Sequence, residues 1–433
     1  MRSTNTAASS ADKKVEWKFS QLFGDKTAAD QIHDEDIITA LEFDTTGRYL
    51  SLGDRAGRLI VFDQADVGSK SKGSVIEYQY LTELQSHVKE FDYLKSTEVE
   101  ERINQIQWLR PQGNSLYVLT TNDKTIKAWK VSDKKIKKAV FLNKNEKDTR
   151  FPQMQVTESG LMPTLLKTYP QLHSYHINSL SACSNGENFI SGDDLRVNLW
   201  TLDRTSEAFN IVDLKPENLE EISEVITSSK FHPTSNNIFL YSTSKGIIKV
   251  GDLRKSSQCE KTAMTLESKE NPANKNFFTD IIVSICDATF SKNGRYIFAR
   301  DFCTVKVWDL ANTSKPLANI PIYDPIKTKL CELYENECIF DKFSIASGPD
   351  SNQVVTGMFN SAFHIIDVKR DINTQFELNF NKKTISKVIP KKCTEVLGGN
   401  YDYTRKILRT TYHPTEHTVA MASLNCLFLY KGS

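Results

Sequence analysis

The chain has 433 residues, its basic and acidic side chains leave a net charge of +1, and its mean hydropathy is -0.42. These values exclude the global basic excess of a nucleic-acid-binding chain and the acidic excess of a disordered one. They indicate a soluble globular protein, with room for two or three ordinary domains or one large repeat-built domain. No apolar run approaches the roughly 18 residues of a membrane span, so we expect none.

The 8 cysteines form no CxxC pair, and the N-terminal stretch MRSTNTAASSADKK lacks the apolar core of a secretory signal. Both features favour a reduced protein with buried thiols and no disulfides. We expect a cytoplasmic location, with the nucleus as a second compartment. We also expect residues 1–14 to form a disordered tail outside the fold.

Seven runs along the chain alternate apolar and polar residues, which is typical of half-buried strands. Each run is preceded by two further strand-like segments joined by turns, as in INSLSACSNGENFISGDD before the third run. The turns contain Gly, Asn, Pro and Asp, the residues that hairpins require. Seven units of this kind predict a radial repeat, the β-propeller. In chain order the runs are residues 57–63, 124–131, 195–202, 246–253, 303–310, 361–368 and 425–431.

A propeller blade needs four strands, and a fourth strand is predicted after six of the seven triplets. The seventh triplet has none, but VEWKFSQLF (15–23) precedes the first triplet and would complete it. We therefore predict an all-β fold over residues 15–433, a seven-bladed β-propeller whose ring is closed by the N-terminal strand. The predicted fourth strands are SVIEYQYLTELQ, the basic segment after Val131, AFNIVDLK, KTAMTLES, KPLANIPIY and TQFELNF.

Three of the runs contain a tryptophan at a matching place, and VWDL (307–310) keeps the dipeptide of the WD40 repeat, which the unit resembles. Strings in the connections between blades resemble a narrower family, the B-type, 55 kDa WD-repeat regulatory subunits of protein phosphatase 2A. The resemblance runs from about Val15 to the end, although segments 132–172 and 382–402 depart from the family pattern. The strings include EFDYLKSTEVEERINQIQWL, SGDDLRVNLW, FNIVDLKPENLEEISEVIT and KLCELYENECIFDKF.

The resemblance implies a non-catalytic regulatory subunit. Such a subunit would bind the helical-repeat scaffold subunit and the catalytic subunit of protein phosphatase 2A, a heterotrimeric serine/threonine phosphatase. It would recruit phosphoprotein substrates with basic motifs. The alternative is a WD-repeat adaptor in another complex, such as a ubiquitin-ligase substrate receptor, although only residues 1–14 lie outside the propeller to hold a linker-binding element.

The sequence carries no catalytic or metal-binding constellation. GDRAGR (53–58) resembles part of a metallophosphatase motif but lacks its second Asp, and no GDxH or GNHE partner exists. His232 and His413 occupy matching HP turns, which indicates a repeated turn device rather than metal ligands. We therefore expect no enzymatic activity, no cofactor and no metal site.

Connections that enter a blade, and turns between its second and third strands, share one face of a propeller, here called the top face. Long connections at 87–102, 213–227 and 326–340 fall on it, and Pro216 with the acidic residues after it predicts a helix over 216–226. An acidic, partly apolar surface fits a basic partner segment, whereas the plainer interpretation is a solvated rim. With the resemblance, it predicts a substrate groove. The groove contacts would be Asp194, Leu219 and Ile222, with Asp193, Tyr175, His176, Glu100 and Glu101 as neighbours.

The insertion after the third strand of the second blade, at about 132–172, falls on the opposite, bottom face and is rich in lysine. We expect a hairpin arm that projects from the ring, and the resemblance implies that this arm grips the scaffold subunit. A basic loop without a partner is the alternative. The scaffold-binding candidates are Lys134, Lys135, Lys137 and Lys138.

The segment SGDDLRVNLW holds two adjacent acids before the third run. Counted back from the tryptophan of each run, Asp194 takes the place of Asp123, whereas Asp193 takes the place of Asp301. Register alone makes Asp194 the structural turn acid, while the resemblance implies that it contacts substrate. Both roles stay open for Asp194, with Asp193 as a supporting acid.

Overall fold

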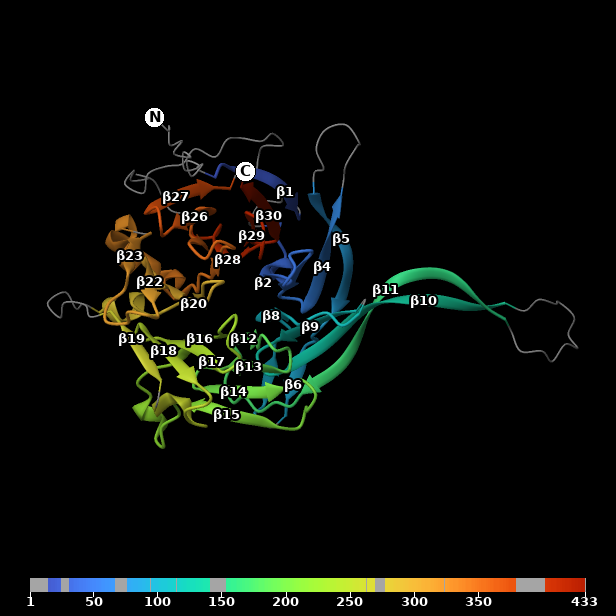
Figure 1. Ribbon diagram of the computed structural model, residues 1–433, viewed down its shortest axis with the longest axis horizontal. Helices are drawn as coiled ribbons and strands as arrows, with labels where there is room; N and C mark the ends of the chain where they lie inside the picture. Colours follow the sequence, from blue (N-terminus) through green and yellow to red (C-terminus); the bar gives the residue numbers. More distant parts are fainter. Residues whose placement is uncertain are drawn as a thin grey trace, which may run out of the picture.

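The structure is a computed structural model that describes residues 15–24, 31–66, 76–93, 95–113, 115–140, 153–261, 263–268, 277–322, 324–378 and 402–432. Its strands form seven four-stranded antiparallel sheets arranged around a common axis as the blades of a propeller (Figure 1). The all-β, seven-bladed fold predicted from the strand pattern is thereby confirmed. The predicted tail, 1–14, lies outside the described residues, as does 382–401.

Within every blade the first strand faces the central axis and the fourth lies at the periphery. Blade 1 contains β2 (Ile38–Phe43), β3 (Tyr49–Asp54), β4 (Arg58–Asp66) and β5 (Ile76–Gln85). Blade 2 contains β8 (Gln105–Trp108), β9 (Leu116–Thr121), β10 (Ile126–Val140) and β11 (Gln153–Tyr169). Blade 3 contains β12 (Ser179–Ala182), β13 (Asn188–Gly192), β14 (Arg196–Thr201) and β15 (Ala208–Asp213).

The remaining blades follow the same order. Blade 4 contains β16 (Ile226–Phe231), β17 (Ile238–Thr243), β18 (Ile247–Asp252) and β19 (Met264–Glu267). Blade 5 contains β20 (Asp287–Phe290), β21 (Tyr296–Arg300), β22 (Thr304–Asp309) and β23 (Ala318–Pro321). Blade 6 contains β24 (Ile345–Ser347), β25 (Gln353–Gly357), β26 (Ala362–Asp367) and β27 (Ile372–Glu377), and blade 7 contains β28 (Ile407–Tyr412), β29 (Thr418–Ser423), β30 (Cys426–Gly432) and β1 (Trp17–Phe23).

The core lies between the blades. All residues of β25 and β29 are buried, because a neighbouring blade covers each face of these second strands. Aromatic rings fill the space between sheets; Tyr169 of blade 2, for example, packs edge-on against Trp200 of blade 3 with ring centroids 5.5 Å apart. Sheet-on-sheet packing of this kind removes apolar surface from water on both sides of every blade.

The ring is closed by pairing the two ends of the described chain. Strand β1 pairs antiparallel with β30, and Trp17 lies opposite Gly432 in the register. The Trp17 ring is 8% exposed and packs edge-on against Tyr412, with centroids 6.0 Å apart. The predicted closure is confirmed, and it covers the edge of β30 with a fourth, peripheral strand.

Blade 2 differs from the expected strand order. The basic segment after Val131 continues the third strand as part of β10, and the fourth strand is β11. The prediction that this segment is the fourth strand was wrong, because the chain makes no turn after Val131 and this segment pairs with β11, which is the fourth strand. Strands β10 and β11 pair along their whole length and extend well beyond the blade as a two-stranded arm (Figure 1).

The two HP turns lock adjacent blades together. His413 Nδ1 accepts the backbone N–H of Glu416 at 2.9 Å, and its Nε2–H donates to the Gly47 carbonyl of blade 1 at 3.1 Å. His232 makes the same contacts within its own turn and with the Gly294 carbonyl of blade 5. Burial lowers the pKa of both imidazoles, which keeps them in the neutral form that these bonds require. The matching turns are therefore blade-to-blade clasps.

The helices are short, and the helix predicted over 216–226 is wrong. Only Leu219–Glu221 forms a single 3-10 turn, η3, capped by the Asn218 side chain, which accepts the Glu220 N–H. The chain then extends so that Ile226 can begin β16, because sheet pairing overrides local helix propensity. No helix in the described part of the chain is long and apolar enough to cross a bilayer.

Candidate functional site

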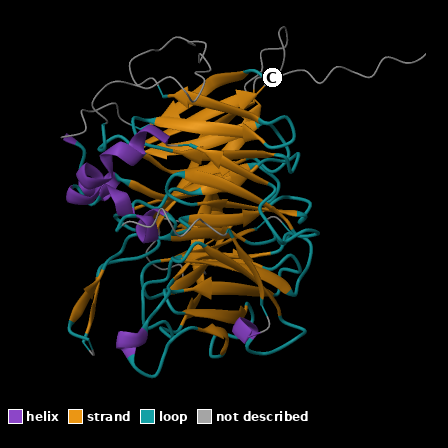
Figure 2. Cartoon of the chain, turned by 90° about the vertical axis from the view of Figure 1, so that its left-hand side faces the viewer, coloured by secondary structure: helices purple, strands orange, loops and turns teal. Residues whose placement is uncertain are grey.

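Most of the non-strand elements gather on the top face. Figure 2 shows the purple helices mostly along one edge of the stacked orange strands. The helical elements on this face are η2 (Asp34–Asp36), η3, α1 (Thr279–Ile282), η6 (Asp324–Lys329), α2 (Leu330–Glu335) and η7 (Cys338–Phe340). The hairpin of β6 (Glu90–Asp92) and β7 (Thr97–Val99) lies on the same face. The remaining short helix, η4 (Cys259–Lys261), joins β18 to β19 on the bottom face.

Asp193 belongs to the interior of blade 3. Its carboxylate accepts the Nδ1–H of His173 at 2.9 Å and two backbone N–H groups of the following turn at 2.7 and 2.8 Å. His173 Nε2 lies 2.6 Å from Ser191 Oγ, which accepts the indole N–H of Trp200 at 2.7 Å. Burial alone would raise the pKa of Asp193, but these hydrogen bonds hold it below its ordinary value. The side chain is 0% exposed, so its assignment to the substrate surface is corrected to a structural one.

Asp194, the next residue, faces the axis of the ring. It lines a central cavity together with Asp123, its counterpart in blade 2. The predicted equivalence with Asp123 therefore holds, but the side-chain oxygen that accepts the turn N–H lies one position earlier, on Asn122, Asp193 and Asp301. Burial raises the pKa of Asp194, and the nearby Lys342 ammonium opposes that rise. Asp194 is thus an acid whose side chain is free of the turn.

Backbone and side-chain contacts join Asp194 to the other candidates on blades 2 to 4. The Asp194 carbonyl accepts the Ile226 N–H at 2.7 Å, which fixes the start of β16 beside it. His176 Nδ1 lies 3.0 Å from Asp123 Oδ2, and the Glu100 carbonyl accepts the Asn122 amide at 3.1 Å. We use the name acidic arc for the top-face surface that carries Glu100, Asp123, Asp194 and the acids of η3. Among the remaining candidates, Glu100 and His176 are exposed, and Glu101 and Tyr175 are half-buried.

Apolar side chains interrupt the acidic arc. Leu219 in η3 is 52% exposed and Ile222, directly after η3, is 37% exposed, with the exposed acids Glu220 and Glu221 between them. Glu224 is instead held by Lys249 at 2.7 Å. Exposed apolar side chains flanked by acids are suited to a partner that brings both cations and apolar groups.

The sequence interpretation missed an aromatic cluster on the same face. Phe277, Tyr334 and Phe340 are 67%, 42% and 56% exposed. Tyr334 contacts the rings of Phe277 and Phe340 with centroids 5.6 and 6.0 Å apart, and Phe278 packs against it at 6.0 Å. Adjacent phenylalanines in an otherwise polar connection were the available signal. Aromatic groups of this kind are common anchors at protein interfaces.

Other predicted residues have no described side-chain geometry. The backbone of Lys134, Lys135, Lys137 and Lys138 lies in β10, but their side chains are outside what the structure describes. Within the described ranges, no group of three His, Cys, Asp or Glu side chains is placed to hold a metal ion.

Comparison with known proteins identifies the WD repeat and full-length relatives of the chain. The family model for the WD domain, G-beta repeat, matches residues 164–201, from β11 to the end of β14. The chain is similar to a serine/threonine-protein phosphatase 2A regulatory subunit of Dictyostelium discoideum, at 40% identity over 97% of this chain and 99% of the relative. It is 41% identical to the B-type regulatory subunit of protein phosphatase PP2A from Schizosaccharomyces pombe, over 97% of this chain and 98% of the relative. A third relative, the protein phosphatase PP2A 55 kDa regulatory subunit of Drosophila melanogaster, is 40% identical over 96% of this chain and 87% of its own length.

Proposed function

Because the chain belongs to the B-type, 55 kDa regulatory subunit family of protein phosphatase 2A, we propose that it is a non-catalytic subunit of that phosphatase that recruits phosphoprotein substrates. It binds the helical-repeat scaffold subunit and the catalytic subunit, and it holds substrates on its top face. Holding a substrate beside a catalytic centre raises the local concentration of the phosphorylated side chain there.

The acidic arc carries the proposal for substrate binding. Asp194 is free of the turn that its neighbour Asp193 holds, and it opens onto the top mouth of the central cavity. Leu219 and Ile222 add exposed apolar surface to the same region. A substrate segment with basic residues and an apolar side chain complements this surface, and the attraction between charges guides its approach.

The arm formed by β10 and β11 supports the proposal for scaffold binding. It extends well beyond blade 2, so it reaches a partner without disturbing the propeller (Figure 1). The lysines at 134, 135, 137 and 138 give this arm a positive charge suited to an acidic partner surface.

The test is assembly followed by substrate binding. The tagged full chain should co-purify with the scaffold and catalytic subunits, and the assembled complex should bind a basic phosphopeptide. Asp194→Lys should leave assembly intact and weaken binding of the peptide roughly tenfold or more, which corresponds to a loss of about 1.4 kcal/mol in binding free energy. Asp203→Lys is the matched control, because Asp203 lies in the same blade on the bottom face with a fully exposed side chain.

The outcomes separate the two parts of the proposal. Failure to capture the scaffold and phosphatase, together with capture of components of another assembly, would favour the adaptor alternative. Intact assembly with equal peptide binding by Asp194→Lys and Asp203→Lys would remove the acidic arc from the proposal while leaving the regulatory role.

A further inference from the structure

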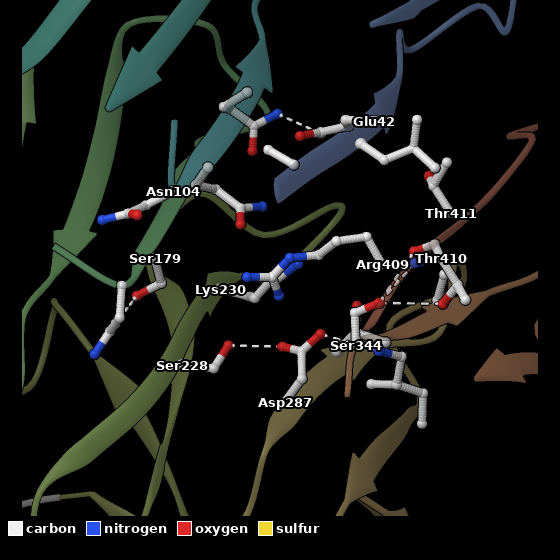
Figure 3. A pocket seen from close by; sticks show the side chains of 18 of the residues that line it. Glu42, Asn104, Ser179, Ser228, Lys230, Asp287, Ser344, Arg409, Thr410 and Thr411 are labelled. Atoms are coloured by element: carbon white, nitrogen blue, oxygen red, sulfur yellow. Dashed lines mark hydrogen bonds between the residues drawn. The ribbon is translucent and has the colours of Figure 1, made fainter. Parts of the chain in front are cut away.

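A cavity of about 710 Å³ runs along the axis of the ring and is lined by the first strand of every blade. Figure 3 shows its interior, where side chains from blades on opposite sides converge. The top mouth carries the acids Asp123 and Asp194 together with the cations Arg55, Arg102 and Lys342. Three further cationic side chains gather in the interior and toward the bottom side: Lys230, Lys292 and Arg409.

Arg409 is the central cation. Its Nε–H donates to the Thr39 carbonyl at 2.6 Å, which anchors the side chain and directs the rest of the guanidinium into the cavity (Figure 3). In the described part of the chain, no carboxylate lies within 4.0 Å of this guanidinium. Burial lowers the pKa of Arg409; Asp287 offsets part of this effect, and neighbouring Arg102 adds to it, so the positive charge is compensated only in part.

Two carboxyl groups, Glu42 and Asp287, lie near enough to these cations to offset part of their charge, but both also accept other hydrogen bonds. Asp287 Oδ1 accepts the Ser228 hydroxyl at 2.9 Å, and its Oδ2 accepts the Ile345 N–H at 3.1 Å, so it joins blades 4, 5 and 6. Glu42 accepts the Gln107 amide at 3.1 Å. Burial raises the pKa of Glu42 to about 8, so its neutral form predominates at pH 7.

Lys230 and Lys292 complete the cationic set. Lys230 lies in β16, on the wall opposite Arg409 (Figure 3), and Lys292 lies in the turn after β20, toward the bottom face. No ion pair within 4.0 Å is formed by either ammonium with the described carboxylates. Burial lowers the pKa of Lys292, and Glu42 offsets only part of this effect.

Cations that lose water without gaining a counter-ion are costly, and a bound anion removes that cost. We propose that the central cavity is an anion-binding site in which Arg409, Lys230 and Lys292 hold a small polyphosphorylated compound. Three cations from three separate blades match several phosphate groups better than one carboxylate. The arginine offers paired donors and the lysines offer point charges, both of which suit phosphate oxygens.

The proposal is tested by isothermal titration calorimetry of the full chain at pH 7 with two probes, pyrophosphate and inositol hexakisphosphate. Binding of either probe is expected, and the tighter one identifies inorganic or polyol phosphates as the ligand source. Lys230→Met and Arg409→Gln should each weaken binding at least tenfold. The matched control is Lys255→Met, an exposed lysine of the same blade on the bottom face, which should bind as the parent chain does.

Absence of binding by both probes would overturn the proposal. Equal binding by the parent chain, Lys230→Met and Arg409→Gln would do the same, since it would indicate an adventitious ion only. Because Arg409 also bonds to Thr39, Arg409→Gln is accompanied by a thermal melt; if it does not fold, Lys230→Met decides the question, as Lys230 makes no such bond in the described structure.

Discussion

Asp193 and Asp194 are consecutive, yet one carboxylate is sealed inside blade 3 against His173 at 2.9 Å and the other lines the central cavity. Charge reversal should separate them by stability alone. Asp193→Lys buries an ammonium beside an imidazole and leaves two turn N–H groups unpaired, so we expect a loss of about 3–5 kcal/mol or failure to fold. Asp194→Lys should cost no more than about 1 kcal/mol.

Urea denaturation followed by tryptophan fluorescence measures both variants. Similar losses for the two would mean that the Asp194 carboxylate also supports the fold. Asp193→Asn keeps the size of the side chain and one acceptor oxygen, so its loss of stability should lie between those of Asp193→Lys and Asp194→Lys.

The clasp between His413 and Gly47 gives a second prediction. Gly47 and Gly294 have φ of 84° and 74°, and a Cβ at either would overlap the facing imidazole of His413 or His232. Gly294→Ala and Gly47→Ala should each lower the free energy of unfolding by about 2–4 kcal/mol, from backbone strain and displacement of the ring.

Gly113→Ala is the matched control for the two clasps. Gly113 has φ of 59°, but nothing lies within 4 Å of its added Cβ, so only the strain of about 1 kcal/mol should appear. Thermal melts of the three variants compare the costs directly. Equal decreases in melting temperature for all three variants would show that the imidazoles move aside at no cost in stability.

Glu42 predicts a pH dependence of stability. Its pKa is raised from 4.5 to about 8 by burial, so the folded chain keeps a proton that the unfolded chain releases between these values. The folded form is therefore favoured below about pH 4.5, and this contribution is lost as the pH rises toward 8. Lys230, Lys292 and Gln107 face this carboxyl and moderate the effect.

Glu42→Gln removes the titrating group while keeping its acceptor oxygen. At about pH 9 the free energy of unfolding of the variant, measured by urea denaturation, should exceed that of the parent chain by about 1–3 kcal/mol. At about pH 5 the two values should be similar. An equal difference at both pH values would mean that the carboxyl does not change its charge across this range.

The ring closure gives a prediction about Trp17. Its indole packs on Tyr412 inside blade 7, so Trp17→Ala should remove about 3–5 kcal/mol of stability and loosen the pairing of β1 with β30. Phe209→Ala is the control, since Phe209 lies on the outer strand β15 and is 59% exposed; it should change stability by less than about 1 kcal/mol. Hydrogen exchange of the β30 backbone amides should accelerate in Trp17→Ala alone.

The strand pattern predicted the propeller because seven repeats of the same alternation leave few other arrangements. Local patterns failed where long-range pairing decides the outcome. Leu219, Ile222 and Ile226 recur at helical spacing, but the Ile226 N–H donates to the Asp194 carbonyl of another blade. The basic segment after Val131 begins with Ser132 and Asp133, which are common in turns, and only its pairing with β11 shows that it prolongs the third strand.

The candidate site was predicted less completely, since adjacent side chains in the sequence can face opposite ways. Counting from Trp200 placed Asp194 beside Asp123 correctly but gave the turn bonds to the wrong acid, because only hydrogen-bond geometry distinguishes the two positions. The Phe277 and Tyr334 rings are far apart in sequence and meet only when blades 5 and 6 pack together. The cationic interior of the cavity likewise joins residues from three blades.

The pairing of Trp17 with Gly432 also orders events during synthesis. Strand β1 is made before blades 1 to 6, whereas its partner β30 is made after them. Blades 1 to 6 can form as their own strands emerge, since each is contiguous in sequence. Blade 7 must wait, with β1 held as an unpaired strand until β30 has been made, so a nascent chain carries an aggregation-prone edge over that time.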